Sequence, residues 1–302
     1  MHPILKGPIE RALSSASLSR MTRRRLRDKR LIIAYHGIIP DGAKPAGERS
    51  LFLAQREFGA HLDMLREVAD VAALDRIDDE GDGRPRVAIT IDDAYKGAVC
   101  EGVQELVKRG LPATIFVAPG RLEGHVFWWD ALADESGQLQ DGVKTHALTT
   151  LCGHDERVRA WAARFAVLTS DALPPYARAA SRAELRAAAC LPGITLGSHT
   201  WSHANLAKLA VSDVISEVNR SRVWLRREFP GKVIDWLAYP YGLDSVATHQ
   251  ALADACYTGG LRIQGGWHNP TRVSRFARPR LNVPSSLSVA GLKARAVGSL
   301  PS

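Results

Sequence analysis

The sequence contains a series of short apolar runs, rich in Val, Ile, Leu and Ala, separated by segments with the period of an amphipathic helix. Continuous apolar runs are typical of strands buried on both faces, and helices between them are the usual crossovers of a parallel sheet. The helical pattern is clearest over residues 56–68 and 211–229. The strand-like runs are residues 31–37, 87–91, 113–119, 194–199, 233–240 and 280–284, with a weaker one at 257–263. We therefore expect an α/β fold built on a helix-covered parallel sheet.

Polar side chains gather at the carboxyl ends of these runs. His36, Asp92, Asp93, His199 and Tyr239 each end a run or directly follow one. In a (β/α) barrel the carboxyl ends of the strands converge on one face, which carries the chemistry. With about seven strands, the pattern predicts a distorted or incomplete (β/α) barrel, and an open doubly wound sheet is the alternative.

The chain is long enough for one large domain, and its 302 residues are 45% hydrophobic. No change of composition divides residues 31–286, which we expect to form a single catalytic domain. Within it, residues 140–190 are rich in Ala and Arg and indicate a helical insertion or long connection. This insertion either covers the site or packs on the outside. Residues 1–30 are set apart as a basic N-terminal arm and residues 287–302 as a C-terminal tail.

The net charge of +8 is concentrated near the N-terminus, where residues 20–30 carry seven basic side chains beside Asp28. Residues preceding this cluster fit a short amphipathic helix, so the arm suits peripheral contact with an anionic membrane. A solvated or frayed arm is the alternative. Nucleic-acid binding is not expected, because no aromatic residues are interleaved with the basic ones.

The cysteines and apolar segments bear on where the protein works. The four cysteines are widely spaced and form no Cys-x-x-Cys pair, so we expect reduced thiols rather than a disulfide framework or a thiolate zinc site. The residues before the basic cluster contain no uninterrupted apolar run that could form a signal-peptide core, and no apolar run in the sequence approaches the length of a membrane span. We expect a cytoplasmic protein, with the basic arm at the inner membrane surface.

Two short motifs carry the chemistry. His199 and His203 are four residues apart in "GSHTWSHANL", and on a helical turn that spacing places both imidazoles on one face. Two histidines and one carboxylate form a facial set for a divalent ion. Asp92 and Asp93 follow the run 87–91, so one could bind the ion while the other acts beside it. Alternatively, this acidic pair could cap a helix N-terminus.

These motifs resemble those of the NodB-type polysaccharide deacetylases, carbohydrate esterase family 4. "TIDDAY" (90–95) is similar to the family's Thr-Phe-Asp-Asp-Gly motif, and "SHTWSH" (198–203) contains its His-Ser/Thr-x-x-His motif. "AYPYG" (238–242) is similar to Arg-x-Pro-Tyr, and "GLPATIFV" (110–117) resembles the strand between the first two motifs. The resemblance extends from about Leu31 to about Val283 and implies the NodB-type barrel.

The resemblance also implies roles for individual residues. Asp92 would be the general base, and Asp93, His199 and His203 would bind a divalent metal, usually zinc. The backbone N–H of Tyr241 would stabilise the oxyanion. The implied reaction is hydrolysis of an acetamide, which leaves a free amine on the sugar.

Two expected catalytic groups have no direct counterpart. Ala238 occupies the position where the family often carries an arginine that orients the base, and Arg280 is our candidate replacement. The late Leu-x-His motif is also missing, because Val283 occupies the His position. His268, in a turn-rich segment, is our candidate for the general acid, whereas His249 fits a structural role in a helix.

Four further residues are assigned to the substrate pocket. His36 ends the first strand and is expected to line the pocket, although a core position suits it equally. Trp128, beside Trp129, is expected to stack on a sugar face at the rim, with burial in the core as the alternative. Tyr239 and Pro240 complete the set.

Together these features predict a metal-dependent hydrolase that removes an N-acetyl group from an amino sugar of a surface glycan or lipid-linked glycan precursor. A deformylase or cyclic-amide hydrolase on the same barrel is one alternative, because fold and metal do not select the acyl group. An inactive glycan-binding member is another. The retained Asp92 argues against it, since a pure binder needs no base.

Overall fold

The structure is a computed structural model, and it describes residues 26–165 and 172–300. Most of the predicted N-terminal arm, residues 1–25, lies outside the described residues. Within the described part, no helix is long and apolar enough to cross a membrane.

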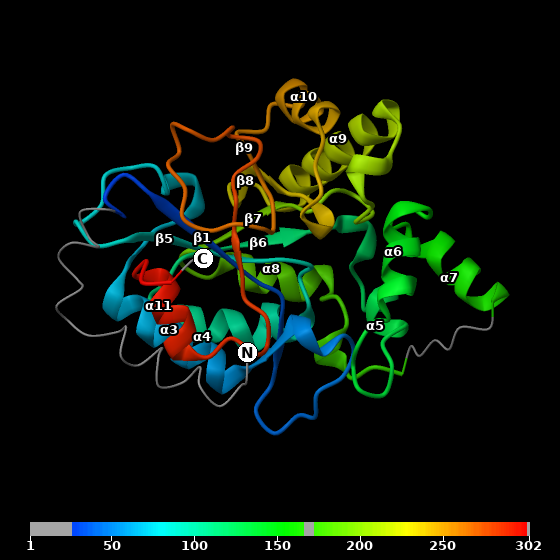
Figure 1. Cartoon of the computed structure of the whole chain (residues 1–302), viewed down its shortest axis with the longest axis horizontal. Coiled ribbons are helices and arrows are strands. Elements are labelled where there is room, and N and C mark those ends of the chain that lie inside the picture. Colours follow the sequence, from blue (N-terminus) through cyan, green and yellow to red (C-terminus); the bar gives the residue numbers. More distant parts are fainter. Residues whose placement is uncertain (1–25, 166–171, 301–302) are drawn as a thin grey trace.

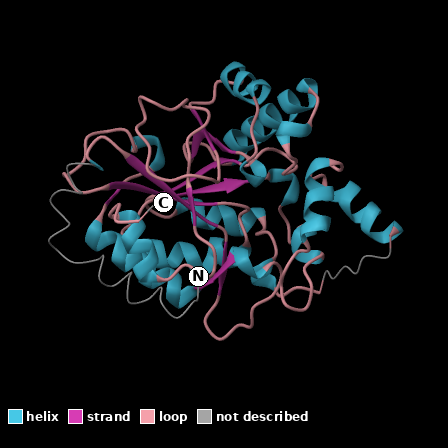
Figure 2. Ribbon diagram, in the orientation of Figure 1, coloured by secondary structure: helices cyan, strands magenta, loops and turns pink. Residues whose placement is uncertain are grey.

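The core is one curled parallel sheet (Figures 1 and 2). Its main path runs in the order β10, β1, β5, β6, β7, β8, β9, and the short strand β4 pairs with the start of β5. The strands are β1 (Arg30–Tyr35), β4 (Asp70–Val71), β5 (Arg86–Ile91), β6 (Ala113–Val117), β7 (Ile194–Ser198), β8 (Val233–Ala238), β9 (Gly259–Leu261) and β10 (Leu281–Asn282). Since β1, β5 and β6 are almost entirely buried, their continuous apolar sequence matches their position. The expected distorted barrel is confirmed.

A single segment bridges the two ends of this path. Residues 275–278 run beside β9, where Gly260 N donates to Arg275 O and Arg262 N donates to Arg278 O, each over 2.9 Å. The same segment continues into β10, which pairs with β1. An irregular strand therefore occupies the place where a regular barrel would have further βα units.

Helices cover the outside of the curled sheet. In Figure 1, α3, α4 and α11 lie together on one side, α9 and α10 lie beside β7 to β9, and α5 to α7 lie beyond the arrowheads of β6 and β7. The helices are α3 (Gln55–Val68), α4 (Val103–Lys108), α5 (Trp128–Ala131), α6 (Asp141–Thr149), α7 (Asp155–Arg164), α8 (Arg182–Cys190), α9 (Val211–Glu228), α10 (Val246–Asp254) and α11 (Val289–Ala296), with a π-helical turn at Ala98–Gly102. Both helices expected from periodicity, α3 and α9, are present.

Three parts of the chain differ from the expected division. A two-stranded parallel sheet of β2 (Gly37–Ile39) and β3 (Phe52–Ala54) follows β1 and was not predicted, because each strand is only three residues long. The predicted C-terminal tail contains α11, whose Leu292 side chain is fully buried. Of the helices in the predicted insertion, only α6 and α7 are additional to the barrel, because α8 is the crossover helix that leads into β7.

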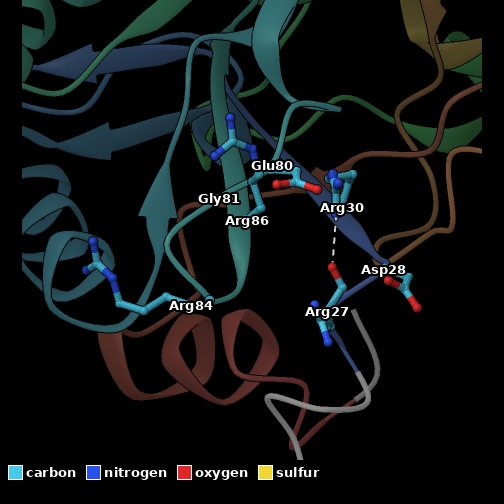
Figure 3. Close-up of a pocket in the computed structure, with 8 residues that line it drawn as sticks. Arg27, Asp28, Arg30, Glu80, Gly81, Arg84 and Arg86 are labelled. Atoms are coloured by element: carbon cyan, nitrogen blue, oxygen red, sulfur yellow. Dashed lines mark hydrogen bonds between the residues drawn. The ribbon is translucent and has the colours of Figure 1, made fainter.

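A pocket lies at the amino ends of β1 and β5, the opposite edge of the sheet from the residues discussed below (Figure 3). Arg86 is paired there with Asp70 over 2.5 Å, and Arg84 with Asp82 over 2.7 Å. The pocket is lined by Arg27, Asp28, Arg30, Glu80, Gly81, Gly83, Arg84 and Arg86. Because its charges are mixed and partly paired, we assign it no part in the chemistry.

Candidate metal and catalytic site

The two adjacent carboxylates leave β5 in different directions. Asp93 (φ 68°) and Ala94 (φ 50°) both have left-handed backbone conformations, which are uncommon for residues other than glycine. The resulting tight turn lets Asp92 face Arg280 while Asp93 faces the histidines of the loop after β7. Both carboxylates are buried, with 2% and 5% exposure. Such strained turns are found where the surrounding structure holds a functional group in place.

The two histidines meet through a turn rather than a helix. Thr200 (φ 64°) and His203 (φ 61°) are left-handed, and the segment from His199 to His203 has no helical turn. Thr200 Oγ1 accepts a hydrogen bond from His203 N over 3.1 Å and closes the loop. The sequence therefore predicted correctly that the two histidines lie close together, but the helical turn given as the reason is absent from this segment.

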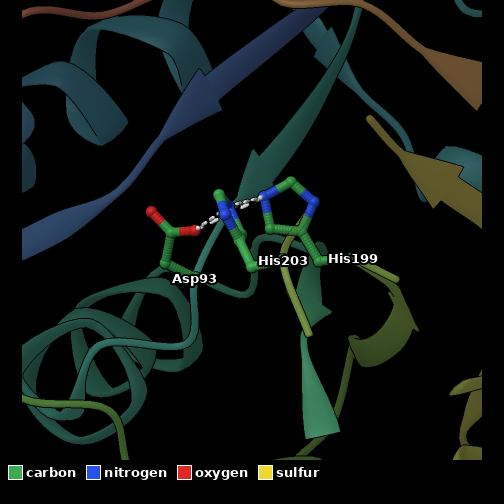
Figure 4. A group of neighbouring side chains, drawn as sticks. All are labelled: Asp93, His199 and His203. Carbon is green, nitrogen blue, oxygen red and sulfur yellow. Dashed lines mark hydrogen bonds and ion pairs between the residues drawn. The ribbon is translucent and has the colours of Figure 1, made fainter. Parts of the chain in front are cut away.

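Among the described residues, Asp93, His199 and His203 form a group that could hold a metal ion, which we call the metal-ligating group (Figure 4). Their ligand atoms lie within 4.8 Å of one another. The Nε2 atoms of the two histidines are 3.1 Å apart, and Oδ1 of Asp93 is 3.0 Å from Nε2 of His203. His199 Nδ1 lies 2.7 Å from the carbonyl oxygen of Ala238, which it can satisfy only as a donor, so Nε2 is the ring atom of His199 that faces the other two residues.

The donor set fits a divalent ion. Asp93 Oδ1 is buried and lies 3.0 Å from Nε2 of His203 and 3.4 Å from Nε2 of His199. Burial favours a raised pKa for Asp93, but hydrogen bonds from His199 and His203 outweigh it, and the pKa lies below its usual range. Burial, and then the charge of His199, lowers the pKa of His203. Burial favours a lowered pKa for His199 as well, but the charge of Asp92 and a hydrogen bond to Asp93 outweigh it, and the pKa of His199 is raised. A metal ion bound by these residues would displace the proton of His199, because a ligating imidazole must be neutral.

Arg280 takes the position predicted for it beside Asp92. Its Nη1 and Nη2 donate to Oδ1 and Oδ2 of Asp92, each over 2.7 Å, and Nη1 also reaches Thr90 Oγ1 over 3.1 Å. The guanidinium is fully buried. Burial favours a raised pKa for Asp92, but the charge of Arg280 and then of His199 outweighs it, and the pKa is lowered. Arg280 thus reaches Asp92 from residues 275–280, the closing segment of the sheet, which runs beside β9 and leads into β10. Ala238, at the motif position where the family often carries an arginine, has no side chain that could do so.

Tyr241 follows β8 at a second strained point. Its φ is 60°, and within the described ranges its backbone N–H has no hydrogen-bond partner. Its ring packs edge-on against His203, with centroids 4.8 Å apart. Its hydroxyl accepts from Trp128 Nε1 over 3.0 Å and donates to Gly153 O over 3.3 Å. An unpaired N–H beside the metal-ligating group can act as an oxyanion donor.

His36 reaches the site from the end of β1. Its Nε2 lies 3.9 Å from Oδ2 of Asp92, and its Nδ1 is buried and has no hydrogen-bond partner among the residues that the structure describes. Its side chain is 10% exposed, so it lines the site as expected.

Four predicted site residues are placed where their predicted roles do not suit them. His268 pairs with Arg30 at the amino end of β1, the opposite end from Asp92, and cannot act as the general acid. Trp128 is 2% exposed beneath Tyr241, so it cannot stack on a sugar at the rim. Tyr239 is fully buried in an apolar cluster and donates to Phe276 O over 2.8 Å. Pro240 is also buried, at the start of the turn that carries Tyr241.

The comparison with protein families bears on what this site is. The family model for polysaccharide deacetylases matches residues 79–260, which include both acidic residues, both histidines and the turn after β8. The chain belongs to the polysaccharide deacetylase family. The resemblance to NodB-type deacetylases is thereby confirmed, and the protein is a hydrolase of amide bonds. No curated protein matches the chain.

Solved structures support the same fold for this deacetylase. The PplD deacetylase of Streptococcus pyogenes is 15% identical, with a TM-score of 0.61 over 89% of this chain and 98% of that one. A polysaccharide deacetylase from Bacillus cereus is 17% identical, with a TM-score of 0.62 over 89% of this chain and 69% of the other. IcaB from Ammonifex degensii is 17% identical, with a TM-score of 0.58 over 89% and 97%.

Sequence reasoning missed two residues that touch the site. Gly153 contacts Tyr241, and the buried Asn205 fixes the segment after His203 to the insertion. Neither has a signal in the sequence, because each matters only through contacts with distant segments.

Proposed function

We propose that this deacetylase is a metal-dependent hydrolase that removes an N-acetyl group from an amino sugar of a surface glycan or lipid-linked glycan precursor. The supporting observation is the convergence of Asp93, His199 and His203 beside a separate carboxylate, Asp92, that is buried and ionised against Arg280. The set contains three ligands and an adjacent base, which a hydrolytic metal site needs.

The ligands would be Oδ1 of Asp93 and Nε2 of His199 and His203. A divalent ion held there, zinc by its preference for imidazole and carboxylate, would supply Lewis-acid chemistry that polarises an acetamide carbonyl and acidifies water.

Asp92 would accept the proton of the attacking water. Its carboxylate lies beside the ligand group, with Oδ2 4.0 Å from Nε2 of His199. Arg280 donates one hydrogen bond to each oxygen of Asp92, which fixes the orientation of the carboxylate and keeps it ionised. The base is therefore fixed in orientation before substrate binds, which reduces the entropic cost of reaching the transition state.

The remaining two roles fall to Tyr241 and His36. The unpaired N–H of Tyr241 would donate to the oxyanion that develops from the carbonyl. With His268 at the opposite edge of the sheet, His36 is the histidine beside Asp92 that is outside the ligand set. We assign it the transfer of a proton to the departing amine.

The substrate assignment draws on the family and on the charge of the chain. The Bacillus cereus structure is that of a polysaccharide deacetylase, and the structure of PplD is a complex with acetate. A cytoplasmic location, with residues 20–30 near an anionic membrane surface, would favour a lipid-linked precursor over a mature wall polymer.

The test is acetate release from short N-acetylglucosamine oligomers, together with elemental analysis for zinc. We expect wild type to hold about one zinc and release acetate, Asp92→Asn to keep zinc but lose release, and His199→Ala to lose both. Release of formate from N-formyl sugars in place of acetate would favour a deformylase. Glycan binding without release, unchanged in Asp92→Asn, would contradict the proposal and favour a binding protein.

A further inference from the structure

The turn between α6 and α7 lies against two loops of the candidate site. It belongs to the helical insertion, which Figure 1 places beyond the carboxyl ends of β6 and β7. Cys152 (φ 56°) and Gly153 (φ 65°) are both left-handed, so the chain reverses sharply and presents two consecutive carbonyl groups. Each carbonyl is used in a contact with a different site loop.

The first contact reaches Tyr241. Gly153 O accepts from the Tyr241 hydroxyl over 3.3 Å, and the same hydroxyl accepts from Trp128 Nε1 over 3.0 Å. A Cβ atom at Gly153 would lie 2.7 Å from Cε2 and 2.9 Å from the hydroxyl of Tyr241. Any other residue at Gly153 would therefore displace the tyrosine ring.

The second contact reaches the loop of the metal ligands. Cys152 O accepts from the backbone N–H of Asn205 over 2.8 Å, and Leu148 O accepts from Asn205 Nδ2 over 2.9 Å. Asn205 is fully buried and lies two residues after His203. One short turn thus contacts both the segment after His203 and the ring of Tyr241.

We propose that the turn at Cys152 and Gly153 is a positioning element of the deacetylation reaction, which holds the Tyr241 N–H in place relative to the metal ligands. Tyr241 has a left-handed backbone, a costly state for tyrosine that persists only where surrounding contacts impose it. An oxyanion donor must also be placed accurately, because small displacements lower the rate strongly. Gly153 and Trp128 are then positioning residues. This inference rests on the proposed function.

The test compares two glycines with the same backbone conformation. Gly153 and Gly110 both have φ +65°, but a Cβ at Gly110 would meet nothing within 4 Å. Gly153→Ala and Gly110→Ala therefore add similar backbone strain, and only the former collides with Tyr241. Tyr241→Phe and Trp128→Phe each remove one partner of the bond between the Trp128 indole and the Tyr241 hydroxyl. Tyr176→Phe is the control for the loss of a hydroxyl, because it removes a bond to Lys44 O.

We expect Gly153→Ala and Tyr241→Phe to lower kcat about tenfold in the zinc-loaded full chain, with KM within twofold and zinc content unchanged. Trp128→Phe should add little in the Tyr241→Phe background, because both changes remove the same bond. Gly110→Ala and Tyr176→Phe should keep wild-type kcat. In nuclear magnetic resonance spectra, the indole N–H of Trp128 should exchange with solvent at least tenfold faster in Gly153→Ala and Tyr241→Phe.

Wild-type kcat in Tyr241→Phe or Gly153→Ala would overturn the inference, whether or not the indole exchange changes. If wild type releases no acetate, the proposed function fails separately, and titration with acetate decides the inference. Weaker acetate binding to zinc-loaded Gly153→Ala than to Gly110→Ala, followed at the Tyr241 N–H resonance, would support a positioning role. Equal affinity would overturn it.

Discussion

Arg280 shows how one buried side chain replaces a missing residue of a family motif. Its guanidinium is fully buried and bonds both oxygens of Asp92, 188 positions earlier in the sequence. Its Nε also donates to Arg262 O over 2.8 Å, so the side chain joins the closing segment of the sheet to the site. Such a buried pair is costly to break, because the remaining partner is a buried charge without compensation.

We expect Arg280→Met to lower the free energy of unfolding of the metal-free protein by about 3–5 kcal/mol. Arg278→Met is the matched control. Arg278 also makes a two-bond pair, with Asp78, but Asp78 is 42% exposed and can be solvated when its partner is lost. The control should lose about 1 kcal/mol or less. Urea unfolding measures both, and equal losses would contradict the assigned role of burial.

His61 connects stability to pH. It is fully buried, with Nε2 3.1 Å from Leu287 O, and burial lowers its pKa to about 4 despite that contact. In the unfolded chain the pKa returns to about 6.5, so unfolding takes up a proton between these values. The contribution of neutral His61 to the free energy of unfolding is complete above pH 6.5 and is lost as the pH falls toward 4.

We expect the unfolding free energy of His61→Gln to depend less on pH. Between pH 7 and 4, wild type should lose at most roughly 3 kcal/mol more than the variant. Part of the slope should remain, since burial also lowers the pKa of His268 to about 4. Urea titrations at several pH values measure it. The same slope in His61→Gln and wild type would contradict the assignment.

At the scale of elements, α8 and α9 flank β7, the strand that leads to His199, but only one of them has a side-chain cap. Ser181 forms a full capping box with Glu184 at the start of α8. Ala210 begins α9 with φ −63° and ψ 151°, an extended conformation suited to a cap, yet offers no side-chain acceptor.

Substitutions at these two positions should therefore have opposite effects. Ser181→Ala should lower the unfolding free energy by about 1 kcal/mol, and Ala210→Ser should raise it by about 0.5–1 kcal/mol. Thermal unfolding monitored by circular dichroism measures both changes. Acetate release per folded molecule should be unaffected, because neither cap contacts the site. A loss of stability in Ala210→Ser would contradict this view of α9.

At the scale of the whole molecule, the metal-ligating group connects loops after two strands that are not neighbours. Asp93 follows β5 and the histidines follow β7, with β6 between them in the sheet. An ion bound by all three would stabilise the folded state, because the unfolded chain does not present this set.

We expect zinc at 100 times its dissociation constant to stabilise the metal-free protein by about 2.7 kcal/mol, and a chelator to reverse the effect. His203→Ala should abolish the stabilisation. His249→Ala should retain it, because His249 bonds Asp244 rather than the ligand group. Melting temperatures with and without zinc measure the effect. An equal effect of zinc on His203→Ala would place the ion elsewhere.

The sequence by itself determined the seven strands of the main sheet path, the helices α3 and α9, and the acidic and histidine residues that meet in the candidate site. These features are local: apolar runs and the helical period reflect burial of the segment itself, and Asp92 and His199 are recognisable from their immediate neighbours. The weakest strands, β9 and β10, were placed correctly but too long, because only a few of their residues pair.

Tertiary structure alone decided which distant groups reach the site. Arg280 was a candidate that the closing segment brings to Asp92, whereas His268 lies at the opposite edge because its segment pairs with the start of β1. Trp128, from α5, and Gly153, from the insertion, both bond the hydroxyl of Tyr241. Such contacts depend on strand order and on a few left-handed turns. Neither property leaves a periodic pattern in the sequence, so only the folded chain reveals them.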